Sequence, residues 1–190
     1  LGQQPISDIT SDNNRAKMAN QRLADVRDSV LRSHPWNCAI KRASLSKHGT
    51  APAWGYDNKF TLPVDFIKLV STEDELVDYR IEAGNQGEVN DTCILSDSST
   101  MKIVYVYKIT DVSKMDSTLK QAIATRLAAD IAVALTGDAS QESLMMQKYE
   151  MIIMQARYED SSERHGLETI HGGSWLDARV GGGFYRDFPN

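Results

Sequence analysis

The chain has 190 residues, of which 41% are hydrophobic and 25% charged, enough for one folded domain with an appended tail. Acidic residues outnumber basic ones by 26 to 21, and the net charge of -5 disfavours a protein that grips nucleic-acid phosphates. Cys38 and Cys93 have no second ligand at metal-binding spacing, and no apolar run reaches the roughly 20 residues that span a bilayer. The sequence therefore predicts no disulfide framework, no zinc site and no membrane partner.

The first expected element is a helix over about residues 12–34. Small and branched apolar side chains recur there at steps of three and four, namely Ala16, Ala19, Leu23, Val26 and Val30. Ser11 or Asp12 would cap its start, and Pro35 would end it at His34. Pro35 then favours a short second helix through Ala43, which would complete a helical elbow. Because Leu1-Gly2 followed by Pro5 is typical of a helix end, we also expect native sequence before Leu1.

Residues 53–111 have a different character, with Gly, Pro and Asn between short runs of β-branched and aromatic residues. The strongest predicted strand is 102–110, and shorter ones are expected at 60–63 and 65–70. Residues 80–83 and 92–95 are predicted to form a hairpin. We expect an antiparallel β-rich insert.

Helical periodicity returns at residues 117–136, where Leu119, Ile123, Leu127, Ile131 and Leu135 repeat every four residues up to Gly137. A further helix is predicted over about 139–164, because Asp138 and Gln141 resemble a capping box. The predicted fold class is therefore α+β and mainly α: a bundle of three long helices with the β-rich insert (53–111) and an extended C-terminal tail, all within one domain of residues 1–190.

The C-terminal arm, residues 166–190, is rich in Gly, His and Ser and cannot build a core. It nevertheless contains large apolar and charged side chains, which we interpret as anchors that order on binding a partner. The predicted partner-binding residues are Trp175, Leu176, Asp177, Arg179, Phe184, Tyr185 and Phe188.

The chemistry-bearing residues do not form a recognisable catalytic or cofactor motif. His34 and His48 lack acidic or cysteine partners at ligand spacing, and the one imaginable metal triad, His165, Glu168 and His171, lies in the Gly-rich arm. The sequence contains no GxSxG, SxxK or phosphate-binding loop. We therefore predict no catalytic residue, no metal and no cofactor.

Two groups of large apolar side chains are expected to have packing roles. The methionines Met145, Met146, Met151 and Met154 are predicted to fill a core or a subunit interface. Trp36 and Trp54, each close to a proline, are predicted to be buried behind the elbow.

Several short motifs occur in an order that resembles a known family. They are Arg27-Asp-Ser-Val-Leu-Arg-Ser-His-Pro-Trp-Asn-Cys-Ala-Ile-Lys-Arg-Ala43, Trp54-Gly-Tyr, Leu62-Pro-Val-Asp65, Ala122-Ile-Ala-Thr-Arg-Leu-Ala-Ala-Asp-Ile-Ala132, Leu135-Thr136, Ala156-Arg157, Glu159-Asp160 and Ser174-Trp-Leu-Asp-Ala-Arg179. Together they resemble the head-to-tail adaptors of short-tailed bacteriophages (podoviruses), also called tail tubular protein A. The resemblance covers nearly the whole chain, although each motif is short.

The resemblance implies a non-enzymatic virion protein at the head-tail junction, synthesised in the cytoplasm of the host bacterium. Twelve copies would form a dodecameric ring between the portal protein and a tail nozzle of the tail tubular protein B type, with tail fibres as a further partner. Genomic DNA would pass through the channel without specific binding. The segment containing Trp175, Leu176, Asp177 and Arg179 would reach a neighbouring subunit or the portal.

Two other classes of function remain open at this point. A small nucleic-acid-binding regulator could use the 138–164 helix as a reader, although the acidic balance disfavours it. A hydrolytic virion enzyme would have to use His165, Glu168 or His171.

Overall fold

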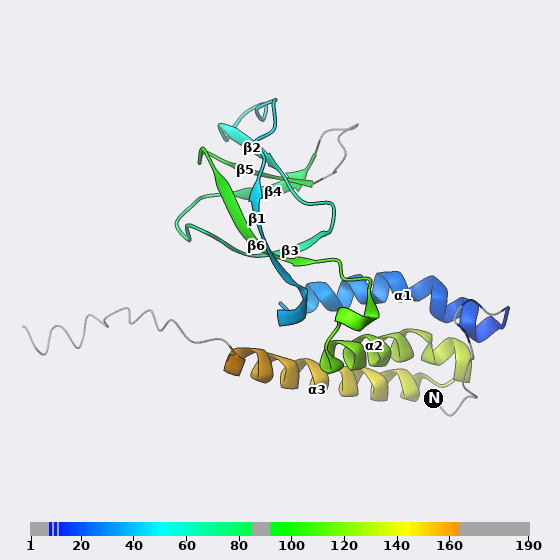
Figure 1. Ribbon diagram of the computed structural model, residues 1–190. Helices are drawn as coiled ribbons and strands as arrows, with labels where there is room; N and C mark the ends of the chain where they lie inside the picture. The colour runs from blue at the N-terminus through cyan, green and yellow to red at the C-terminus, as the bar shows by residue number, and fades with distance from the viewer. Residues whose placement is uncertain (1–7, 9, 11, 85–91, 164–190) are drawn as a thin grey trace, which may run out of the picture.

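A computed structural model describes residues 8, 10, 12–84 and 92–163. These residues form three α-helices, α1 (Asn14–Ser33), α2 (Ser117–Thr136) and α3 (Ala139–Glu163), and two three-stranded antiparallel sheets (Figure 1). About 48% of the described residues are helical and 23% lie in strands. The predicted fold class, a mainly helical bundle with a β-rich insert and an extended tail, is therefore wrong. The protein is a compact α+β structure in which the two sheets form one half, the β half, and the three helices form the other, the helical half.

The helix ends follow from local chemistry. Asn13 caps α1, because its side-chain oxygen accepts a hydrogen bond from the Arg15 amide at 3.0 Å. Asp116 caps α2 in the same way through the Leu119 amide. Gly137 ends α2 in the left-handed conformation, with φ at 70°. The three helices consequently lie within a few residues of their predicted ranges.

The predicted short helix from Pro35 to Ala43 is wrong. Only the 3-10 turn η1 (Asn37–Ala39) forms, and the strand β1 (Ile40–Leu45) follows it. β1 pairs antiparallel with β6 (Met101–Tyr107), in a register that joins Ile40 to Val106. Residues 40–45 form a strand because their hydrogen bonds to β6, about 60 residues away in the sequence, outweigh the local helical pattern. β1 thus lies before the predicted insert.

The other strands are β2 (Asn58–Thr61), β3 (Phe66–Thr72), β4 (Arg80–Ala83) and β5 (Thr92–Ser96). One sheet has the order β1-β6-β3 and the other has the order β2-β5-β4. The predicted hairpin is confirmed, because β4 and β5 pair antiparallel from Arg80 with Leu95 to Ala83 with Thr92. An isolated bridge between Lys47 and Phe60 joins the two sheets, and the His48 amide donates to the Lys59 carbonyl at 2.7 Å.

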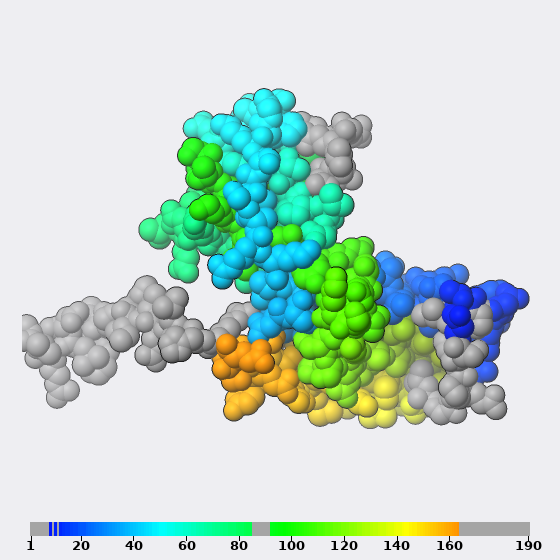
Figure 2. Space-filling view, viewed as in Figure 1, coloured from blue at the N-terminus to red at the C-terminus, as the bar shows by residue number. Residues whose placement is uncertain are grey.

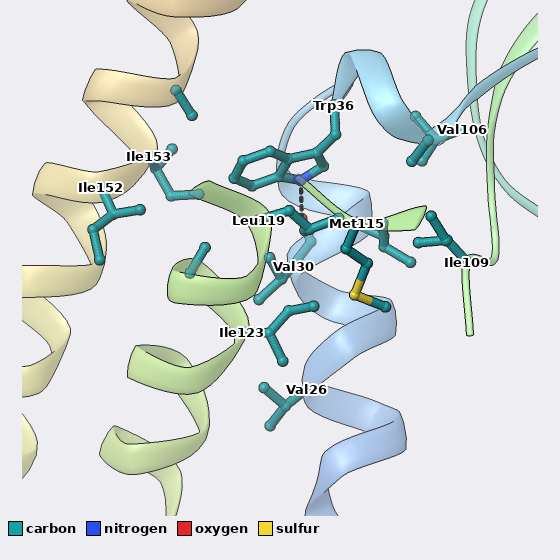
Figure 3. Packing of buried hydrophobic residues seen from close by; sticks show 14 residues of the cluster. Val26, Val30, Trp36, Val106, Ile109, Met115, Leu119, Ile123, Ile152 and Ile153 are labelled. Atoms are coloured by element: carbon teal, nitrogen blue, oxygen red, sulfur yellow. Dashed lines mark hydrogen bonds between the residues drawn. The ribbon is translucent and has the colours of Figure 1, made fainter. Parts of the chain in front are cut away.

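Two separate cores meet at β6. Ile103 and Tyr105 contribute to a core between the sheets, together with Phe60, Leu62, Ile94 and Met101. Val106 instead enters the helical core, where Trp36 is packed against residues of all three helices (Figure 3). The Trp36 indole also donates to the Val30 carbonyl at 3.0 Å. Since successive side chains of a strand point to opposite faces, β6 fixes the β half to the helical half.

The helices are stacked one after another beneath the sheets. α1 contacts β3 and β6, α2 packs on α1, and α3 packs mainly on α2. In the ribbon diagram α3 is the helix farthest from the sheets, and the space-filling view shows the β half standing on one part of the helical half (Figures 1 and 2). One long side of α3 therefore faces away from the body of the protein.

Candidate interaction surfaces

The two histidines within the described residues have structural surroundings. His34 is buried, and its ring forms a hydrogen bond with the Asp160 carboxylate. His48 lies at the surface, where its Nδ1 accepts from the Thr50 amide at 3.1 Å. Within the described ranges, no group of three His, Cys, Asp or Glu side chains could hold a metal ion. His165, Glu168 and His171 lie outside the described residues.

An acidic groove of about 310 Å³ lies where η1, α2 and α3 meet, and Cys38 lines it. Its carboxylates already accept hydrogen bonds within the fold: Glu159 from Thr118 at 3.2 Å, and Glu163 from Asn37 at 2.8 Å. Burial and the nearby Asp116 raise the pKa of the Cys38 thiol to about 11. Because the thiolate is the reactive form, Cys38 is a poor nucleophile at neutral pH. We therefore interpret this groove as a structural junction between η1, α2 and α3.

Asp65, the last residue of the Leu62-Pro-Val-Asp65 motif, connects two strands of the β half. Its carboxylate accepts from Lys41 at 2.7 Å and from the Tyr105 hydroxyl at 3.0 Å. Partial burial opposes ionisation, but these hydrogen bonds and the positive charge of Lys41 hold the pKa of Asp65 below its usual value. Burial and the Asp65 carboxylate raise the pKa of Tyr105 to about 12. This cluster is a structural link between β1 and β6.

The β half exposes large apolar side chains in its loops. Trp54, Val64 and Leu76 are 83%, 81% and 94% exposed. The prediction that Trp54 is buried is therefore wrong, whereas Trp36 is fully buried as predicted. Trp36 follows α1 directly and packs in the helical core, whereas Trp54 lies in a loop of the β half next to Gly55, which has a φ of 93°. Trp54 also lines an open pocket of about 490 Å³ with Lys59, Arg80 and Glu82.

The helical half exposes a second apolar surface, the outer face of α3. It consists of Leu144, Met151, Met154 and Tyr158, which are between 52% and 77% exposed. The opposite face of α3 contributes Ile152, Ile153 and Ala156 to the core. Of the four methionines, Met145 and Met146 are half-buried, whereas Met151 and Met154 lie on the outer face. The outer face could have been found from sequence, because Leu144, Met151 and Tyr158 recur every seven residues.

α3 is a poor candidate for a nucleic-acid reader. Its acidic residues are Glu142, Glu150, Glu159, Asp160 and Glu163, whereas its basic residues are Lys148 and Arg157. Phosphate binding needs a surplus of positive charge along the docking face. Among the described helices, none is long and apolar enough to cross a membrane.

The predicted partner-binding residues all lie outside the described residues. They are Trp175, Leu176, Asp177, Arg179, Phe184, Tyr185 and Phe188. The exposed side chains of the β half were not predicted from the sequence as binding residues, whereas Met151 and Met154 of the outer face of α3 were predicted to lie in a core or a subunit interface.

Comparison with known proteins adds no assignment. No protein-family model matches the chain, and no curated protein sequence is a significant match. The function must therefore be argued from the residues and surfaces of the chain itself.

Proposed function

We propose that this chain is a structural head-to-tail adaptor of a short-tailed bacteriophage, forming a dodecameric ring that connects the portal protein to the tail nozzle. The proposal rests on the resemblance of its motifs to tail tubular protein A and on the surfaces that the fold leaves open. In this role the subunit surrounds the DNA channel and carries out no chemistry. Its place is the head-tail junction of the virion.

The observation that carries the proposal is the exposure of large apolar side chains on both halves of the molecule. Trp54, Val64 and Leu76 are exposed on the β half, and the outer face of α3 is exposed on the helical half. A contiguous apolar face such as the outer face of α3 typically marks a protein–protein contact. A subunit between two assemblies needs several such contacts at once, whereas an enzyme needs one preorganised site.

The arrangement of the motif residues also supports the proposal. His34 and Asp160 come from separate motifs and are 126 residues apart in sequence, yet they form a hydrogen bond. Lys41 and Asp65 likewise come from separate motifs and form an ion pair at 2.7 Å. The residues that carry the resemblance thus contact one another in the fold, as expected if they define one common architecture.

The decisive experiment is electron microscopy of the purified chain mixed with the portal protein encoded with it. We expect a ring of added density on the tail side of the portal. A truncated chain ending at residue 165 should not attach, and a chain ending at residue 180, which keeps Trp175 to Arg179, should attach. Circular dichroism of both truncations must show unchanged helix content. No added ring with the full chain, or equal attachment of the chain ending at 165, would contradict the proposal.

A further inference from the structure

The outer face of α3 has the sequence pattern of one strand of a coiled coil. Leu144, Met151 and Tyr158 occupy equivalent positions seven residues apart, and Met154 follows Met151 by three residues, at the second apolar position of the heptad. These two kinds of heptad position form the seam of the outer face. Gln147 and Ser161 fill the remaining seam positions, so the seam is uncharged along its whole length. The core-facing side of α3 packs against α2, and the seam points away from it. α3 therefore has two usable packing faces, and the described residues of the chain occupy one of them.

The exposed area of this seam supplies more than half of what an interface needs. With exposures from 52% to 77%, four side chains of about 200 Å² each leave roughly 500 Å² accessible. A stable protein–protein interface needs about 800 Å² from each partner. The seam and the residues along its two sides can supply that area.

A shallow groove of about 310 Å³ runs along one side of the seam. It is lined by Ser33, Tyr149, Glu150, Ile153, Met154 and Arg157. Glu150 and Arg157 are both exposed, and no ion pair is formed by either of them within the described part of the chain. Both occupy the position that directly precedes a seam residue, where coiled-coil partners form salt bridges. As far as the chain is described, the groove thus has an acid and a base one heptad apart, neither of them in an ion pair.

This charge pattern is complementary to itself when the helix direction is reversed. In an antiparallel pair about a two-fold axis, Met151 meets Met154 of the partner copy and Glu150 faces Arg157 of the partner copy, twice by symmetry. In a parallel pair, Glu150 would instead face Gln155 and Arg157 would face Ser162, which leaves both charges unpaired. The pattern favours a second copy of this chain in antiparallel orientation.

We propose that the free chain forms a two-fold dimer in which the outer face of α3 packs antiparallel on the same face of a second copy. This inference does not rest on the proposed adaptor function. Neighbours in a closed ring contact each other through two different faces, so a two-fold contact between α3 helices lies outside the ring. The dimer is the form in which the unassembled chain covers its apolar seam.

The test is sedimentation equilibrium of the full 190-residue chain and of charge-exchange variants. We expect a reversible monomer–dimer equilibrium for the wild type. Glu150→Arg and Arg157→Glu should each weaken the dimer, raising Kd on the order of tenfold, because two like charges then face each other in each pair. The double variant E150R/R157E should restore the wild-type Kd, because the pairs are re-formed with exchanged charges.

Two further variants complete the design. Met154→Asp should abolish the dimer without unfolding the chain, since Met154 is 60% exposed, and circular dichroism checks the fold. Arg42→Glu, at an exposed residue of β1, makes the same charge change as Arg157→Glu and should leave Kd unchanged. A strictly monomeric wild type, species larger than a dimer, or a double variant as weak as the single ones would overturn the proposal.

Discussion

The imidazole Nε2 of His34 forms a hydrogen bond with the Asp160 carboxylate, in a buried contact between the end of α1 and the last turns of α3. His34 is the residue at which α1 ends, and its ring also meets Trp36 edge-on at 5.1 Å between ring centroids. The Tyr149 hydroxyl of α3 also donates to the Ser33 hydroxyl of α1 at 3.2 Å, whereas most helix packing involves α2. The pair of His34 and Asp160 is therefore a principal direct connection between the first and third helices.

Asp160→Ala should lower the free energy of unfolding by about 2 kcal/mol, because it leaves the buried His34 ring without its hydrogen-bond partner. His34→Ala should cost a similar amount. Chemical denaturation of each variant measures the loss. The double variant should lose clearly less than the sum of the two single losses, because both residues contribute to one interaction. Strictly additive losses would show that the contact contributes nothing as a pair.

Tyr105 should make the stability of the β half sensitive to alkaline pH. Its pKa in the folded chain is raised to about 12, so the fold favours the protonated phenol. Its contribution to stability is therefore complete below the pKa of an unfolded tyrosine, about 10, and is lost as the pH rises from about 10 to about 12. Tyr105→Phe should remove this part of the pH dependence, as measured by urea unfolding at a series of alkaline pH values. Parallel losses in both proteins would refute the assignment.

Gly137 should be sensitive to substitution because of its backbone conformation. Its φ of 70° lies in the left-handed region, and the space around its missing Cβ is open, so only backbone strain opposes a side chain. We expect Gly137→Ala to lower the free energy of unfolding by about 1 kcal/mol, and Gly137→Asn to cost less, because Asn tolerates this conformation. Gly49→Ala is the matched control, since Gly49 also has open space but no positive φ. An equal effect at both glycines would contradict the argument.

Cys38 should react slowly with thiol reagents in the folded chain. Its pKa of about 11, against an ordinary value of 9.0, lowers the thiolate fraction at neutral pH on the order of 100-fold. The rate of reaction with an aromatic disulfide reagent should rise sharply when the chain is unfolded in urea. The variant Cys38→Ser isolates the reaction of the buried Cys93. A Cys38 that reacts in the folded chain as fast as in the unfolded chain would show that the thiol is not protected.

Much of the fold could be predicted where the signal is local. The three helices, the hairpin of β4 and β5 and the strand β6 follow from periodicity, capping residues and turn residues. The prediction failed at β1, because its strand conformation depends on pairing with β6 and not on its own residues. It failed at Trp54 because a nearby proline, which both Trp36 and Trp54 have, does not decide whether a side chain is buried.

The candidate surfaces were harder to predict than the elements that carry them. Met151 and Met154 were assigned to a core or an interface, and sequence could not separate the two, because apolar residues occur on both faces of α3. The acidic residues of α3 and the motifs that carry the resemblance could be identified from the sequence, but the contacts that these residues form could not. His34 and Asp160 are separated by 126 residues, and no periodicity links them.

The sequence by itself determined the extent of the helices to within a few residues, because Asn13, Asp116 and Gly137 act on backbone groups only a few residues away. The cap of α1 is Asn13, whereas Ser11 or Asp12 was predicted. The sequence also determined the acidic balance of the chain and the heptad spacing of the outer face of α3. Only the tertiary structure decided that residues 40–45 form a strand, that Trp36 is buried and Trp54 exposed, and which face of α3 stays open. These outcomes depend on surfaces contributed by distant segments, and the free energy of burying one face is known only when its partner is in place.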